Sequence, residues 1–482
     1  MRVGFSPAPL SLALACVLAG VSPGSPAAAQ DRPVDPLALV DARYDRTAAV
    51  ARAIWDFAEL GYQENRSSAL LQQELAKEGF KVTKGVAEIP TAFVAEWGTG
   101  GPIIGILAEF DALPGVSQAD VPVKQADAKP AAHACGHNLF GSGSATAAIA
   151  LSQWLKATGT PGTVRLYGTP AEEGGSGKVY MVRAGLFDDV DFALHWHPSS
   201  VNSAAAQTSL ANRSAKFRFH GKAAHAAGAP AQGRSALDGV EAMNMMVNMM
   251  REHTTMDSRI HYVITQGGSA PNVVPEFAEV FYYVRHSQTA EVEAMWKRLE
   301  DAARGAAMGT GTTVDWEIIH GNNPLLVNET LAKVMDAKLR QVGGMALTPE
   351  ETQFATEIGK TLAAPQPVAQ AAVIEPYGKS LGYGSTDVGD VSWATPTVGL
   401  NTATWAPGTP AHSWQSAAAS GTSMGFKGAQ LAAKAMTLMA VQLFTDPELR
   451  KSARAEFDAS RGPGYEYRSL LGDREPPLDF RK

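Results

Sequence analysis

Short apolar runs that alternate with helical stretches are the feature that most restricts how this chain can fold. The runs predict strands, and stretches such as Ser144 to Leu155 carry apolar residues at helical spacing. The strand candidates are Thr91 to Trp97, Ile103 to Ala108, Val164 to Tyr167 and Phe192 to Leu194. Strands interleaved with helices predict an α/β core with a mixed, mostly parallel sheet flanked by helices.

The pattern changes near Ala211. Lys216 to Gly221 alternates as KFRFHG, Arg234 to Arg251 predicts a Met-rich helix, and strand patterns follow. This predicts a compact α+β insert within a chain of 482 residues, which is long enough for two or three domains. The expected parts are a catalytic domain over 30–210 and 323–458, an inserted domain over 211–322, and a C-terminal tail over 459–482.

Residues 1–29 have the pattern of a signal peptide. Arg2 supplies a positive start, Pro9 to Val21 is almost wholly apolar, and Ala27 to Ala29 offers a small-residue cleavage site. Cys16 lies in the apolar run, but the residues before it match a lipid-attachment box poorly. The run is shorter than the roughly 20 residues that span a bilayer. We expect an exported protein, periplasmic or extracellular, without a membrane span.

Charge and cysteine content narrow the function further. A formal net charge of -7 without a long Lys/Arg run argues against nucleic acid as a partner. Removal of the leader leaves Cys135 as the single cysteine, so no internal disulfide is expected. That thiol needs another role.

The densest chemical signal is the hexapeptide HACGHN, residues 133–138. Cys135 and His137 are two positions apart, so an extended segment or tight loop projects both to one side. Thiolate and imidazole are good ligands for zinc-type ions. For this hexapeptide alone, a metal site and a buried cysteine beside two satisfied histidines are equally good interpretations.

The segment TPAEEGGSGK, residues 169–178, places Glu172 and Glu173 at the carboxyl end of a predicted strand, where α/β folds usually keep their sites. Neighbouring carboxylates repel, so without a cation one tends to stay protonated. With a cation, one binds it while the other takes a proton from metal-activated water. A Glu-Glu pair is more often a solvated helix face, but a Gly- and Pro-rich turn after a strand favours a site.

Two further segments bring histidines to strand ends. LHWHP, residues 194–198, holds His195 and His197 on one face of a strand, and at most one is needed as a ligand. GTPAHSW, residues 408–414, holds His412 in a loop. A single histidine is more often structural, but four such segments at strand ends predict a binuclear metal site.

Two other motifs are chance matches. Gly421 to Gly425 fits the G-x-S-x-G elbow, but that fold needs its histidine after the serine, and none follows His412. Gly174 to Lys178 lacks the upstream glycine and the following Ser or Thr of a phosphate loop. The sequence thus argues against a serine hydrolase and a phosphate-binding loop.

Eight ordered motifs resemble the aminoacylase and carboxypeptidase-G type metallopeptidases, in the branch of the aminobenzoyl-glutamate hydrolase B subunits, over nearly all of the mature chain. The motifs are AEFDALPGVSQ (108–118), HACGHNLFGSGS (133–144), GTPAEEGGSGK (168–178), WHP (196–198), AAHAAGAPAQGRSALD (223–238), PNVVP (271–275), GSTDVGDVSW (384–393) and GTPAHSWQ (408–415).

The resemblance implies a catalytic domain that binds two divalent ions, with zinc or manganese expected. It assigns the general base to Glu172. For one further ligand, the Trp-His-Pro string of this branch favours His197, whereas the His-x-x-Pro pattern of sister amidohydrolases points to His195; we prefer His197. The other positions that match family ligands are Cys135, His137, Glu173 and His412.

The resemblance also implies that the insert is a lid that dimerises. His225 matches a residue that reaches across the dimer to stabilise the oxyanion of the reaction. Asn272 and Arg285 match lid positions that hold the carbonyl and carboxylate of the substrate. Carboxypeptidase relatives have His-x-Asp where this chain has Glu109-Phe-Asp111, so Asp111 is expected to orient a ligand.

We therefore predict a metal-dependent hydrolase that cleaves the amide bond of small N-acyl or N-aroyl amino acids, aminobenzoyl-glutamate first, as a homodimer joined through the lid. The alternatives are a dipeptidase or aminoacylase of other specificity, and a metal-dependent binding protein that no longer hydrolyses. Retention of both Glu172 and Glu173 argues against a binder, because binding needs the ligand but not the base.

Overall fold

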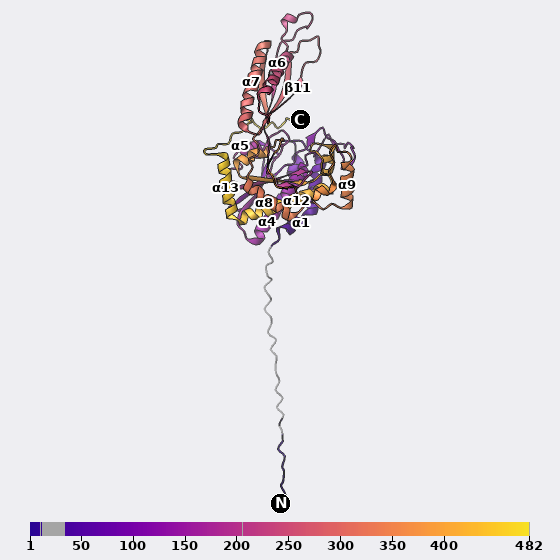
Figure 1. Cartoon of the computed structure of the whole chain (residues 1–482), viewed down its shortest axis with the longest axis vertical. Coiled ribbons are helices and arrows are strands. Elements are labelled where there is room, and N and C mark those ends of the chain that lie inside the picture. The colour runs from indigo at the N-terminus through magenta and orange to yellow at the C-terminus, as the bar shows by residue number, and fades with distance from the viewer. Residues whose placement is uncertain (10, 12–33, 205, 482) are drawn as a thin grey trace. The chain divides into compact units, whose positions relative to one another are not determined.

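The computed structural model describes residues 1–9, 11, 34–204 and 206–481 of the chain. The signal peptide predicted over residues 1–29 falls largely on residues 10 and 12–33, which lie outside the described residues. Residues 35–482 form one compact unit, and the description below concerns that unit (Figure 1). Among the described residues, no helix is long and apolar enough to cross a membrane.

The first and last parts of the unit contribute the strands of a seven-stranded sheet, in the order β1-β2-β6-β3-β7-β15-β8. The four neighbouring strands β6, β3, β7 and β15 run parallel, whereas β1, β2 and β8 pair antiparallel. This confirms the predicted mixed, mostly parallel sheet. The strand bounds are Lys81–Lys84 (β1), Phe93–Thr99 (β2), Ile103–Ala108 (β3), Gly162–Gly168 (β6), Phe192–Ser199 (β7), Ser203–Ala204 (β8) and Thr397–Ala403 (β15).

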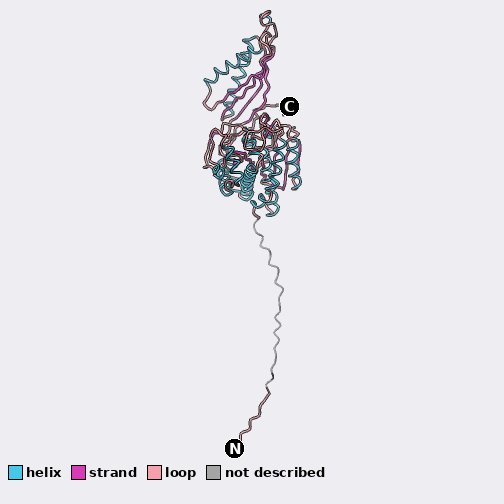
Figure 2. The backbone as a smooth tube through the Cα atoms, turned by 90° about the vertical axis from the view of Figure 1, so that its right-hand side faces the viewer, coloured by secondary structure: helices cyan, strands magenta, loops and turns pink. Residues whose placement is uncertain are grey.

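Apolar helices cover this sheet (Figure 2). The long helices α4 and α12 pack against each other and against the parallel strands, because both carry long runs of buried small and apolar residues. The helix bounds are Pro36–Asp41 (α1), Tyr44–Phe57 (α2), Asn65–Lys77 (α3), His137–Thr158 (α4), Gly177–Arg183 (α5), Glu329–Val342 (α8), Pro349–Gly359 (α9), Val388–Ala394 (α10), Trp414–Ser420 (α11), Ser423–Thr445 (α12) and Pro447–Arg461 (α13). Two short strand pairs, Leu113–Pro114 (β4) with Ala131–Ala132 (β5) and Gln207–Thr208 (β9) with Ser380–Leu381 (β14), complete this part.

The segment 211–322 forms a second sheet of four antiparallel strands, in the order β11-β12-β10-β13, with α6 and α7 packed on it (Figure 1). The alternating pattern of β10 buries Phe217 and Phe219 against Trp296 of α7 and its neighbours. The side chain of Ser235 accepts a hydrogen bond from the backbone of Asp238 and so starts α6. The bounds are Ala211–His220 (β10), Ala236–Met250 (α6), Arg259–Gln266 (β11), Phe277–His286 (β12), Thr289–Thr310 (α7) and Thr313–Asn322 (β13).

Candidate metal centre

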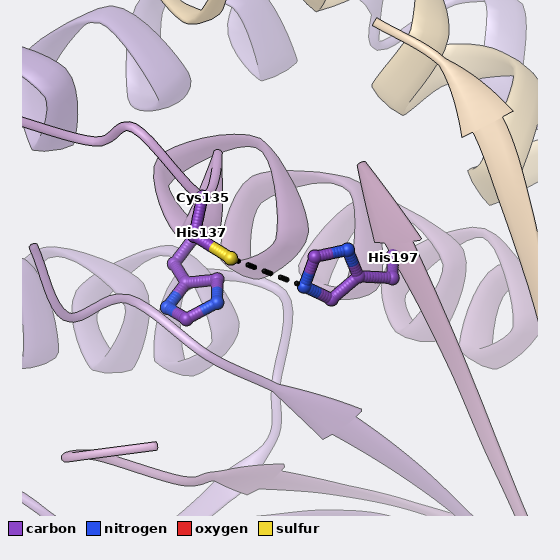
Figure 3. Close-up of side chains that lie close together, drawn as sticks. All are labelled: Cys135, His137 and His197. Atoms are coloured by element: carbon purple, nitrogen blue, oxygen red, sulfur yellow. Dashed lines mark hydrogen bonds between the residues drawn. The ribbon is translucent and has the colours of Figure 1, made fainter. Parts of the chain in front are cut away.

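The carboxyl ends of the parallel strands gather the chemically active residues. Glu109 and Asp111 follow β3, Glu172 and Glu173 follow β6, and His197 lies in β7 two residues before its end. Parallel strands end at the same edge of a sheet, so these side chains converge there. The loop before α4 carries Cys135, and His137 is the first residue of that helix, so both side chains lie near His197 at this edge, as Figure 3 shows.

Cys135, His137 and His197 form the first group whose ligand atoms all lie within 4.8 Å of one another. The Sγ atom of Cys135 lies 3.4 Å from Nε2 of His197 (Figure 3). Gly136 makes this approach feasible: its φ is +80°, and a Cβ there would lie 2.7 Å from a Pro198 side-chain atom. Burial, together with the Glu173 carboxylate, raises the pKa of the Cys135 thiol, so a thiolate here requires a nearby cation.

Cys135, Glu173 and His412 form a second such group. Nε2 of His412 lies 3.4 Å from Oε1 of Glu173. His412 has a φ of 60°, a conformation that costs a non-glycine residue about 1 kcal/mol, and its backbone N–H donates to the carbonyl of Ala134. Strain of this kind persists where the surrounding structure holds a side chain in a required place.

The pKa values of the two adjacent glutamates are shifted in opposite directions. Burial and the carboxylates of Glu109 and Glu173 raise the pKa of Glu172 well above its ordinary value. Burial also opposes ionisation of Glu173, but the imidazole of His412, 3.4 Å from its Oε1, and the charge of His137 outweigh that effect and lower its pKa. Opposed pKa values in neighbouring acids suit one group to carry a proton and the other to remain ionised.

Asp111 contacts two of the candidate ligand residues, His137 and Glu173. Its Oδ1 lies 2.9 Å from Nδ1 of His137, and its Oδ2 accepts a hydrogen bond from the Glu173 backbone at 2.9 Å. The contact fixes the imidazole so that Nε2 of His137 faces the cluster.

Three buried atoms of this cluster have no hydrogen-bond partner among the described residues: Nε2 of His137, Oε2 of Glu109 and Oε1 of Glu173. The first two lie 3.1 Å apart, but without the geometry of a hydrogen bond. Unpartnered buried polar atoms are costly, and these converge with a thiol and two further imidazoles. Soft sulfur, imidazole nitrogen and carboxylate oxygen are the donors that zinc-type ions take. The residues present therefore fit a metal site.

His195 takes a different place from His197. It is buried, and a Cβ on Gly399 of β15 would lie 2.2 Å from its Nε2, so His195 packs against the neighbouring strand. Burial lowers the pKa of His195 to about 3, which keeps the ring neutral. The structure thus brings His197, and not His195, to Cys135.

Lys178 is buried beside the carboxylates of the cluster. The sequence motifs did not predict this role for it. Its Nζ lies 2.7 Å from Oε1 of Glu109 and 2.7 Å from Oδ1 of Asp387, and all three side chains are at most 1% exposed. The neighbouring carboxylates outweigh burial and raise the pKa of Lys178. A permanent cation therefore neutralises part of the buried acid cluster.

A cavity of about 530 Å³ joins the cluster to the second sheet. On the insert side its wall includes Arg285 of β12, with Asn212 and His320. His225 and Asn272 do not line it. They are exposed neighbours elsewhere on the insert, where the N–H of Ala226 donates to the carbonyl of Asn272.

A partly buried set of sulfur, imidazole and carboxylate donors at the carboxyl edge of such a sheet, in which Glu172 and Glu173 have pKa values shifted in opposite directions, defines a metal-dependent hydrolase. Residues 105–386 match Peptidase family M20/M25/M40, and the chain belongs to this family.

Two relatives in sequence and one solved structure are similar to the chain. It is 39% identical over 446 residues to the B subunit of p-aminobenzoyl-glutamate hydrolase from Escherichia coli K12, covering 86% of this chain and 93% of the relative. It is 32% identical over 433 residues to the Xaa-Arg dipeptidase of Mus musculus, covering 87% and 90%. A dinuclear metal-binding M20 peptidase from Bacillus subtilis shares the fold, with a TM-score of 0.58, 17% identity, and coverage of 84% of this chain and 99% of that one.

The family predicted from the eight motifs is thereby confirmed, together with the fold class and the assignment as a hydrolase. The chain is a metal-dependent amidohydrolase. The number and identity of the ions and the individual residue roles stay predictions.

Proposed function

We propose that this chain hydrolyses the amide bond between an aroyl or acyl group and a free amino acid, with p-aminobenzoyl-glutamate as the first candidate. The observation that carries the proposal is the cavity in which the Glu172 and Glu173 carboxylates and the Arg285 guanidinium meet. Such a cavity suits a small substrate with a scissile amide at one end and a carboxylate at the other. The Escherichia coli relative, named for that substrate and 39% identical, supports the choice.

Two divalent ions, zinc or manganese, are the proposed cofactors. The residues that would hold them are Cys135, His137, Glu173, His197 and His412, which form the two overlapping groups described above. When bound, such ions polarise the amide carbonyl and make water more acidic. Cysteine in the set favours zinc, whereas the carboxylate and histidines also suit manganese.

Glu172 carries the proton in the proposed reaction. Its raised pKa lets it accept a proton from water as the water oxygen bonds to the amide carbon. The same proton then passes to the nitrogen as the carbon–nitrogen bond breaks. The products are a carboxylic acid and an amino acid, and Glu172 returns to its starting state.

The insert would bind the other end of the substrate. Arg285 faces the cavity and suits the carboxylate of the amino acid. His225 and Asn272 lie outside that wall, so their proposed contact with the substrate requires a neighbouring subunit. This agrees with the expected role of His225 as a donor to the oxyanion across a dimer.

The insert carries a surface suited to such a subunit. On α6, Met245 and Met249 are 62% and 60% exposed, and beside them on the edge strand β11, Ile264 is 40% exposed. An apolar edge strand beside an apolar helix face is a common protein interface. We propose that this surface binds another subunit of the same fold. The predicted homodimer stays a prediction, because the Escherichia coli relative is named as one subunit of its enzyme, which favours a related second chain.

We also propose export. The support is the apolar run Pro9 to Val21 followed by Ala27 to Ala29. Expression of the full chain followed by amino-terminal sequencing of the secreted fraction should give a mature start at Gln30. Recovery of the intact leader on protein retained in the cytoplasm would refute export.

Hydrolysis of p-aminobenzoyl-glutamate by metal-loaded protein tests the function. We expect release of glutamate by the wild type and a loss of about a hundredfold or more in Glu172→Gln. A second candidate is a dipeptidase, favoured by the mouse relative named Xaa-Arg dipeptidase. Cleavage of Xaa-Arg dipeptides without release from p-aminobenzoyl-glutamate would move the assignment to that activity.

A further inference from the structure

The tail segment, residues 462–481, runs back to the candidate metal centre. Two side chains of earlier segments hold its path: Nη1 of Arg183 donates to the carbonyl of Gly472 at 2.8 Å, and Nε2 of Gln63 donates to that of Leu478 at 2.8 Å. Near the end of the segment, the ring of Phe480 packs edge-on against Tyr62 with centroids 5.7 Å apart. These contacts place the next residue, Arg481, at the cavity.

Arg481 lines the cavity beside the two glutamates. Its Nη2 donates to the backbone carbonyl of Glu173 at 2.6 Å. No other hydrogen bond or ion pair of Arg481 occurs within the described part of the chain, so most of its guanidinium donors remain open to a ligand. One nitrogen of the guanidinium is therefore held by a hydrogen bond, and the other nitrogens can donate to a ligand in the cavity.

Arg285 is a second cation in the same wall. Its Nε is buried without a hydrogen-bond partner, and no carboxylate of the described residues pairs with it. Burial raises the pKa of Tyr283, and the charges of both Arg285 and Arg481 oppose that rise. Both guanidinium groups thus act on one phenol in one cavity.

We propose that Arg481 is a specificity-determining residue that binds the side-chain carboxylate of an acidic amino acid, while Arg285 binds its α-carboxylate. The proposal rests on the function proposed above and names the substrate class more closely: amides of glutamate or aspartate. Two unpaired cations suit a ligand with two carboxylates, because each gains a charge-assisted hydrogen bond. A basic side chain at the same place would meet like charge and be rejected.

The two cations favour the substrate type of one relative over that of the other. One relative is named for a glutamate amide and the other for dipeptides that end in arginine. A cavity in which Arg285 and Arg481 form no ion pair with the described residues, and in which the lining acids are the two glutamates of the candidate metal centre, favours the first. A purely structural Arg481, which only holds the Glu173 backbone, would instead leave the choice of amino acid unaffected.

The test compares N-benzoyl derivatives of glutamate, glutamine and arginine with the metal-loaded wild type and Arg481→Gln. We expect kcat/KM of the wild type to be at least about tenfold higher for the glutamate amide than for the glutamine amide, since one charged hydrogen bond is worth about that factor. In Arg481→Gln this preference should vanish through KM, with the glutamine amide unchanged. Arg481→Lys should recover part of it, and Arg304→Gln, at a side chain of α7 that is 54% exposed and does not line the cavity, should resemble wild type.

Calorimetric binding of free glutamate and glutamine gives a reading that does not depend on turnover. Tighter binding of glutamate that is lost in Arg481→Gln supports the proposal. Equal preference for the two amides in the wild type, or an equal loss on both in Arg481→Gln, would overturn it. Absence of hydrolysis of every amide would overturn the proposed function, and the binding measurement would still decide the role of Arg481.

Discussion

The Sγ atom of Cys135 lies 3.4 Å from Nε2 of His197, whereas His195, two residues earlier on β7, packs against Gly399. This difference makes a sharp prediction for metal content. His197→Ala should lower the bound metal by about one ion per chain and abolish most activity, because a metal site loses a ligand. His195→Ala should keep the metal content of the wild type, although the buried cavity it leaves costs roughly 2 kcal/mol of stability.

Metal analysis after gel filtration of both variants measures this directly. The two substitutions are matched in chemistry and differ only in position. A loss of metal from His195→Ala with retention by His197→Ala would reverse the assignment. Equal loss from both would show that the strand itself, and not one ligand, had been disturbed.

The sequence could not choose between these histidines by spacing. Residues two apart on a strand share one face, so His195 and His197 look equivalent in a local pattern. His195 stands opposite Gly399, about two hundred residues away, whose missing side chain leaves space for that ring, whereas His197 stands opposite Asn401. Local periodicity predicted the strands and helices well, because burial repeats along each element, but it carries no information on such distant neighbours.

Glu172 and Glu173 should separate catalysis from metal binding. Glu172→Gln keeps the shape of the side chain but cannot take a proton, so we expect activity to fall by about two to four orders of magnitude with the metal retained. Glu173→Gln removes the negative charge of a proposed metal ligand that lies next to His412, so this variant should lose metal as well as activity. Activity and metal content measured on the same preparations test both expectations. Full metal in Glu173→Gln would contradict its role as a ligand.

Lys178 should support the stability of the fold. Lys178→Met leaves the buried carboxylates of Glu109 and Asp387 without their cation, and breaking a buried ion pair costs about 3–5 kcal/mol. The free energy of unfolding in urea should fall by that amount, and the added substitution Asp387→Asn should recover part of it. Lys297→Met, at a side chain that is 78% exposed, is the control and should change stability by less than about 0.5 kcal/mol. A loss below about 1 kcal/mol in Lys178→Met would show that the pair is dispensable.

The roles of Lys178 and Arg481 could not be predicted from the sequence. The run that holds Lys178 matched a phosphate loop by chance, and its partner Asp387 lies 209 residues further along. Arg481 stands in a polar tail whose pattern predicts no element. Both positions depend on tertiary contacts that bring distant segments together, and no local motif encodes them.

The apolar surface of α6 and β11 should control assembly. Met249→Glu places a charge on a side chain that is 60% exposed, and its burial in an interface would be costly. We expect the dissociation constant of the wild-type assembly to rise by at least about tenfold, as measured by light scattering across a dilution series. Met308→Glu, on α7 and 83% exposed, is the matched control and should leave assembly unchanged. Unchanged mass in Met249→Glu would exclude this surface as the interface.

Glu74 of α3 should make stability depend on acidity. Nε of Arg46 donates to its Oε2 at 2.7 Å, and Lys77 donates to its Oε1 at 2.9 Å. The hydrogen bond from Arg46, against the effect of burial, lowers the pKa of Glu74 from 4.5 to about 2. A carboxylate with a depressed pKa stabilises the fold above its unfolded pKa, and this contribution disappears as the pH falls from about 4.5 towards 2.

The size of this effect is limited because the Arg46 side chain is 47% exposed and water screens the pair, so we expect about 1 kcal/mol. Urea unfolding at about pH 6 and about pH 3 should show the wild type losing roughly that much more stability than Glu74→Gln. Arg46→Met should flatten the pH dependence in the same way, because it removes the principal donor. Parallel pH profiles in the wild type and both variants would mean that Glu74 keeps its ordinary acidity in the folded chain.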